Sequence, residues 1–148
     1  MSLFVDEDAS AMIEFAITMP LIVFIFLATI SLALVIRENI EIIDAASAGA
    51  KYGANGNSTN SVGMQTAATN DAADVSGLSV TASRYCSCIA GGAAVPCTSS
   101  CSLYPNTPAA YVTVTTSAPA PLLFTVVGLP SSIPLSGTST IRVPWTGQ

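Results

Sequence analysis

The sequence of 148 residues contains no histidine and few charges: 9% of its residues are charged and 7% are aromatic. Without histidine, the chain lacks the commonest general base and a common metal ligand. Serine and threonine are frequent, but no nucleophile motif, phosphate-binding loop or convincing acid–base pair accompanies them. The four Lys and Arg residues do not form a basic face for nucleic acid. We therefore predict a protein that is not an enzyme, with no cofactor, no metal, no small-molecule substrate and no nucleic-acid partner.

One long segment near the N-terminus has no charge at all. It covers residues 15–36 and directly follows Glu14. As a helix these residues span about 33 Å, which matches the hydrocarbon core of a bilayer. A secretory signal has a basic start and a shorter apolar run, whereas residues 1–14 carry four acids and no base. We therefore predict a retained transmembrane helix over residues 15–36.

The helical recurrence of apolar residues continues beyond Ile36, and Gly53 and Gly56 supply a C-terminal cap. We therefore predict a leader or N-terminal tail over 1–10, one long helix over 11–54, and a head over 55–148. In the head, composition and period-2 alternation predict a short helix over 61–75 and strands over 78–88, 110–117 and 138–143. The stretch from 119 to 137 is interrupted by prolines and gives no clear prediction. The expected fold is α+β: a long N-terminal transmembrane or assembly helix, a short second helix and a small antiparallel sheet.

All four cysteines, Cys86, Cys88, Cys97 and Cys101, lie within sixteen residues. An even, clustered set in a small loop-rich region is typical of disulfides in an oxidising compartment, which places the head outside the cytoplasm. Arg37 alone favours the opposite orientation. A zinc site is the alternative for the cysteines, although the spacing lacks a CxxC pair. A hairpin favours the nested pairs Cys86–Cys101 and Cys88–Cys97 over Cys86–Cys97 with Cys88–Cys101.

Glu14 lies at the entrance of the apolar helix, where a carboxylate is costly unless a positive group meets it. One interpretation is an interfacial acid that reaches the lipid headgroups. The other is an assembly residue that meets a positive partner in a bundle, such as the terminal amine of a neighbouring chain or a helix N-terminus. Pro20 lies inside the same helix, where neighbouring helices can satisfy the carbonyl that it leaves free.

The stretch SAMIEFAITMPL, residues 10–21, resembles the N-terminal signature of TadE-like proteins, which are pilin-related subunits of tight-adherence, type IV pilus-related systems. Glu14, Phe15 and Pro20 match the signature, and the resemblance implies that these residues serve assembly. It also implies processing between Ala9 and Ser10. Here Ala9 replaces the glycine of the family and the leader is acidic, so cleavage and retention of the leader both stay open.

From these features we expect a structural pilin-like subunit of a pilus-related filament or pilus-associated complex, assembled through the N-terminal helix. Its partners would be copies of itself, other pilin-like subunits and, before assembly, the inner membrane. The chain would be a single-pass membrane protein with an extracytoplasmic head, and would reach the cell surface or an extracellular filament once assembled. The alternative is a monomeric, membrane-anchored extracytoplasmic binding domain, which gives Glu14 and the helix beyond Ile36 no role.

Overall fold

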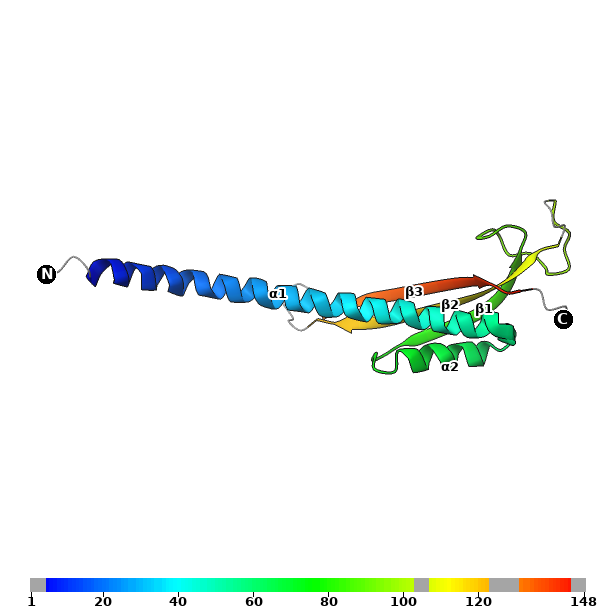
Figure 1. Cartoon of the computed structure of the whole chain (residues 1–148), viewed down its shortest axis with the longest axis horizontal. Coiled ribbons are helices and arrows are strands. Elements are labelled where there is room, and N and C mark those ends of the chain that lie inside the picture. Colours follow the sequence, from blue (N-terminus) through cyan, green and yellow to red (C-terminus); the bar gives the residue numbers. More distant parts are fainter. Residues whose placement is uncertain (1–4, 103–106, 123–130, 145–148) are drawn as a thin grey trace.

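The computed structural model describes residues 5–102, 107–122 and 131–144, with side chains from residue 12 onward. A long helix α1 is followed by a second helix and a three-stranded sheet, which confirms the predicted α+β class. In Figure 1 the sheet and α2 lie along the C-terminal half of α1, while the N-terminal half projects from one end of the head. The elements are α1 (Val5–Tyr52), the turn η1 (Gly53–Asn57), α2 (Ser61–Asp71), β1 (Ser79–Ser87), β2 (Ala109–Pro121) and β3 (Ser132–Arg142).

Helix α1 is continuous over 48 residues, a length of about 72 Å. It begins at Val5, so the predicted tail is helical from there, and residues 1–4 lie outside the described residues. The early start has a physical reason, because three acids at positions 6–8 interact favourably with the positive end of the helix dipole. The helix ends at Tyr52, and in the turn that follows Gly56 adopts a φ of +91° that favours glycine.

Helix α2 ends at Asp71, four residues before the predicted end. Asn60 caps its N-terminus, where the side-chain oxygen accepts a 2.8 Å hydrogen bond from the Gly63 N–H. The buried side chain of Met64 joins the core between α1 and the sheet. Gly49 of α1 permits the close contact of the two helices, because a Cβ there would lie 2.7 Å from the Met64 carbonyl oxygen.

The three strands form one antiparallel sheet in the order β1-β2-β3. β2 ends and β3 begins within the stretch 119–137, for which we made no clear prediction from the sequence. Prolines had obscured these extensions, since Pro119 and Pro134 are direct partners across the two strands. They are tolerated because β1 pairs with β2 only as far as Ser117, so β2 is an edge strand beyond that point.

The two faces of the sheet differ sharply. One face packs on the helices, and along β2 it presents the buried residues Ala110, Val112, Val114, Thr116, Ala118 and Ala120. The opposite face carries hydroxyl groups, prolines, an arginine and two tyrosines whose rings stack with centroids 5.5 Å apart. In two of its rows, threonine hydroxyls pair across β2 and β3 at 2.8 and 3.2 Å. We call it the open face; its residues are Ser79, Thr81, Ser83, Tyr85, Tyr111, Thr113, Thr115, Ser117, Pro119, Pro134, Ser136, Thr138, Thr140 and Arg142.

The first buried residue of α1 among the described side chains is Ile42, where the helix packs closely against the sheet. The Thr116 side chain is fully buried, and its hydroxyl donates a 2.7 Å hydrogen bond to the Ile42 carbonyl oxygen. Gly137 is the β3 partner of Thr116, and a Cβ there would lie 2.9 Å from the Cα of Ile43. The absence of a side chain at 137 therefore lets the helix backbone lie directly on the sheet.

Candidate functional site

The projecting half of α1 is apolar and uncovered. It is long and apolar enough to cross a membrane, and only 6% of its most apolar 18-residue window is buried. Its exposed large apolar side chains are Met12, Ile13, Phe15, Ile17, Met19, Leu21, Ile22, Val23, Phe24, Ile25, Phe26, Leu27, Ile30, Leu32, Leu34 and Ile36. A surface of this size requires lipid or protein to cover it.

Hydroxyl groups in this segment do not interrupt its apolar surface. Thr29 donates to the Phe26 carbonyl oxygen at 2.7 Å, and Ser31 donates to that of Leu27 at 3.1 Å. Such bonds to the preceding turn satisfy the hydroxyls without a partner on another chain. The segment therefore presents apolar atoms on all sides to any neighbour.

Glu14 and Phe15 lie at the start of this exposed surface. Among the residues whose side chains the structure describes, no cation lies within 4 Å of the Glu14 carboxylate. The Thr18 hydroxyl contacts the Glu14 main-chain carbonyl oxygen at 2.9 Å rather than the carboxylate. Phe15 is 61% exposed. Among the described side chains, Glu14 is thus without an ion-pair partner, and it lies beside an exposed aromatic ring on one helical turn.

Pro20 lies within α1, and the helix continues through it as one element. Because proline has no N–H, the carbonyl of Ala16 lacks its usual donor one turn later. The predicted processing residues, Ala9 and Ser10, belong to the same helix, and their side chains are outside the described ones.

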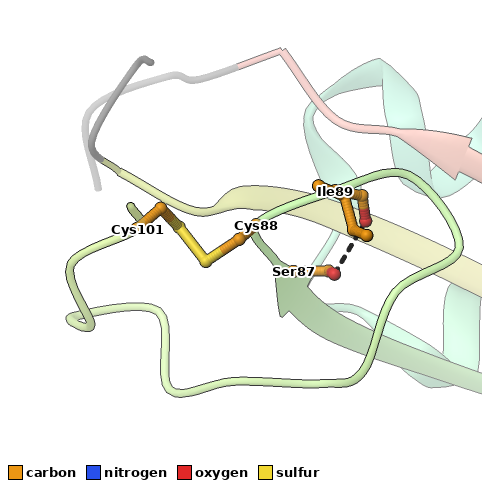
Figure 2. Close-up of a disulfide and its surroundings, with 4 residues drawn as sticks. All are labelled: Ser87, Cys88, Ile89 and Cys101. Atoms are coloured by element: carbon orange, nitrogen blue, oxygen red, sulfur yellow. Dashed lines mark hydrogen bonds between the residues drawn. A yellow bond between two sulfur atoms is a disulfide. The ribbon is translucent and has the colours of Figure 1, made fainter. Parts of the chain in front are cut away.

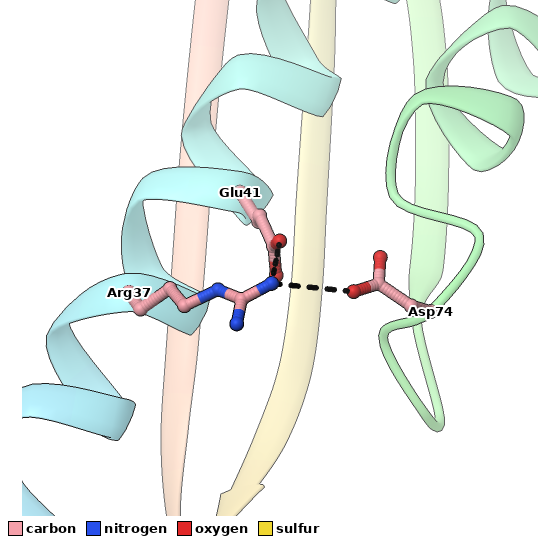
Figure 3. A network of polar contacts seen from close by, with 3 residues as sticks. All are labelled: Arg37, Glu41 and Asp74. Carbon is pink, nitrogen blue, oxygen red and sulfur yellow. Dashed lines mark hydrogen bonds and ion pairs between the residues drawn. The ribbon is translucent and has the colours of Figure 1, made fainter.

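Arg37 marks the boundary between the apolar segment and the head. Its Nη2 lies 3.3 Å from Glu41 Oε1 and 3.9 Å from Asp74 Oδ2, as Figure 3 shows. Asp74 comes from the segment after α2, and the sequence did not predict its proximity to Arg37. Around these groups an open groove of about 310 Å³ is lined by Leu34, Arg37, Glu38, Glu41, Asp74, Val75, Ser76 and Pro121. The boundary is therefore polar, with one cation among three acids.

Two further apolar residues of α1 are exposed beyond this boundary. Ile40 is 54% exposed and Ile43 is 46% exposed, and both lie on the same helical face as Ile36. Helical periodicity alone would have assigned both to the side covered by the head. We call Ile36, Ile40 and Ile43 the upper stripe.

The cysteines form two disulfides that join the end of β1 and the residue just after it to the following loop. The bonds are Cys86–Cys97 and Cys88–Cys101, with Cα–Cα distances of 5.2 and 5.6 Å, so the nested pairing favoured from the sequence is wrong. The loop folds back so that the Val95 N–H donates to the Cys86 carbonyl oxygen at 2.8 Å, which brings Cys97 beside Cys86.

Figure 2 shows the second bond and the nearby contact in which the Ser87 hydroxyl donates to the Ile89 carbonyl oxygen at 2.8 Å. Because all four sulfurs are joined in pairs, no thiolate remains for the alternative zinc site. The two disulfides therefore cross-link the end of the head that is distant from the apolar segment.

Comparison with known proteins gives one match. No curated protein and no solved structure matches the chain. The family model described as TadE-like protein matches residues 9–51, which cover Glu14, Phe15, Pro20 and almost the whole of α1. The resemblance expected from the sequence is thereby confirmed over this helix, which is similar to that of TadE-like proteins and is long and apolar enough to cross a membrane.

Proposed function

We propose that the chain is a structural pilin-like subunit of a tight-adherence filament or pilus-associated complex, which assembles through α1. The observation that carries this proposal is the apolar surface of α1, which is exposed on all sides and projects from the head. The family match over residues 9–51 supports it, because it covers this helix. We infer no catalytic role.

The energetics of this surface restrict where the helix can go. In the membrane, lipid covers it. Outside the membrane, each large apolar side chain left in water costs about 1.5–3 kcal/mol, and more than a dozen are exposed. A subunit that leaves the bilayer must therefore bury α1 against other helices. Copies of the same chain and related pilin-like subunits supply such helices.

The disulfides support the proposed location of the head. Disulfides persist in oxidising compartments, so we place the head outside the cytoplasm and α1 in the inner membrane before assembly. After assembly the chain would lie at the cell surface or in an extracellular filament. In that state the open face and the disulfide-bonded loop would belong to the exposed head.

Electron microscopy of material sheared from the producing cells tests the proposal. Filaments or pilus-associated particles that contain this chain, identified by mass spectrometry and antibody labelling, are the expected result. A chain found only as a monomer in the membrane fraction would refute assembly and favour a membrane-anchored binding domain.

We also propose that assembly follows a cut between Ala9 and Ser10. The cut would remove three acids and place the new terminal amine one helical turn before Glu14. N-terminal sequencing of the chain from its native cells tests this step. A start at Ser10 supports processing, and a start at Met1 or Ser2 refutes it.

A further inference from the structure

The apolar surface of α1 is longer than a bilayer can cover. From Met12 to the end of the upper stripe at Ile43, exposed apolar side chains extend over about 46 Å of helix. The hydrocarbon core is about 30 Å thick. If the segment 15–36 lies in the bilayer, Ile40 and Ile43 lie outside it, beyond Arg37. The upper stripe therefore continues the apolar surface of α1 beyond the hydrocarbon core, where a protein partner can cover it.

The two ends of this surface carry opposite charges in the same local pattern. At each end an isoleucine directly precedes the charged residue, and a second isoleucine follows it by three residues. The two sets are Ile13, Glu14 and Ile17, and Ile36, Arg37 and Ile40. The repeat is 23 residues, or about 35 Å along a helix. A parallel neighbour displaced by this distance would bring its Glu14 level with Arg37 and its Phe15 level with the middle of the upper stripe.

We propose that the upper stripe of one copy binds the N-terminal turns of α1 of a second copy at this displacement. In this contact Glu14 of one copy pairs with Arg37 of the other, and the Phe15 ring packs between Ile36 and Ile40. The inference rests on the proposed filament, and it specifies the axial offset of two subunits. It does not depend on processing, because Glu14 and Arg37 are both retained after a cut at Ser10.

Arg37 can bind a further carboxylate besides those of Glu41 and Asp74. Both of its contacts within the head use the same nitrogen, Nη2, and a guanidinium has five N–H donors. The Arg37 side chain is 69% exposed, and ion pairs in water contribute little, so the head contacts do not hold it away from a neighbour. An acid enclosed among apolar helices interacts much more strongly with such a cation.

The offset also gives the contact a direction. Subunits side by side in one bilayer have Glu14 at one end of the span and Arg37 at the other, so they cannot form this pair. The displacement of about 35 Å exceeds the thickness of the hydrocarbon core. The pair can therefore form only when one copy has been drawn outward relative to the next, which is the arrangement in a growing filament.

Charge reversal provides the first test. Arg37→Glu would place two carboxylates together, and it should lower the yield of sheared filaments at least about tenfold because apposed like charges are costly. Combining it with Glu14→Lys should restore assembly. Arg84→Glu is the control, since Arg84 is an exposed cation on β1, and it should leave the yield unchanged. Formation of both disulfides and a wild-type amount of the protein in the membrane fraction confirm that each variant folds.

Cross-linking provides the second test and covers the case in which charge variants fail to assemble. Filaments of the double variant Phe15→Cys and Ile40→Cys should give a ladder of covalent multimers on oxidation. Phe15→Cys with Lys51→Cys, which requires a much larger offset, should not. Filaments that show no ladder, or that form normally with Arg37→Glu, would overturn the inference and leave the proposed function intact. If the wild type forms no filaments, the proposed function fails and the inference fails with it.

Discussion

Replacing Gly137 by alanine tests whether the direct contact of α1 with the sheet holds the head together. The added Cβ would lie 2.9 Å from the Cα of Ile43 and 3.1 Å from the Ile42 carbonyl oxygen. Both contacts are backbone atoms of a helix, so neither can rotate away. Strand propensity alone would favour alanine over glycine by about 0.5–1 kcal/mol. The clash should reverse this sign.

The magnitude follows from two costs. Overpacking in a tight core costs about 1–3 kcal/mol. A helix displaced from the sheet also lengthens the buried bond from Thr116 to Ile42, which is worth about 1 kcal/mol. We therefore expect a loss of about 2–4 kcal/mol in the free energy of unfolding of the head, and a fall in Tm of at least about 8 °C.

The assay is urea unfolding of the full chain in detergent micelles with its disulfides intact, followed by the near-ultraviolet signal of the tyrosines. Ser136→Ala is the matched control, because Ser136 is the preceding residue on β3 and lies on the open face, and it should change stability by less than about 0.5 kcal/mol. If Gly137→Ala is as stable as the wild type, the account of this contact is incorrect.

Three further predictions concern the head. Replacing Cys88 and Cys101 together by serine removes a cross-link over 13 residues and should lower the free energy of unfolding by about 2–3 kcal/mol. In the wild type, peptide mapping under non-reducing conditions that joins Cys101 to Cys86 or Cys97 would contradict the observed pairing. Asn60→Ala removes the α2 cap and should cost about 1 kcal/mol in the same assay, and an unchanged urea midpoint would show that the cap contributes nothing. Arg37→Ala should cost less than about 1 kcal/mol because its ion pairs are exposed, so a loss above 2 kcal/mol would mean that the groove stabilises the head.

Much of this fold could be predicted from local patterns. The uncharged run of residues 15–36 predicts the projecting helix. The alternation of apolar and polar residues around Tyr85 and Tyr111 predicts two of the strands. The extended parts of β2 and β3 could not be predicted, because tolerance of Pro119 depends on where the neighbouring strand ends. Likewise, the disulfide pairing depends on a loop contact made by Val95, which no spacing of cysteines encodes.

The site was only partly accessible to the same reasoning. Glu14, Phe15 and Pro20 could be selected from sequence because their motif is contiguous. The exposure of Ile40 and Ile43 could not, because periodicity shows that a helix has an apolar face without showing which part the head covers. The closeness of Asp74 to Arg37 likewise depends on how the segment after α2 returns to α1.

The composition of the open face limits how heads can associate. Its residues are serines, threonines, tyrosines, prolines and one arginine, and none of them is valine, leucine, isoleucine or methionine. Stacking two such faces would remove hydration from many hydroxyls and gain little apolar burial in return. Adhesion of one head sheet to another is therefore disfavoured. In the proposed filament the heads would stay apart, and contacts between the helices would determine the order of the subunits.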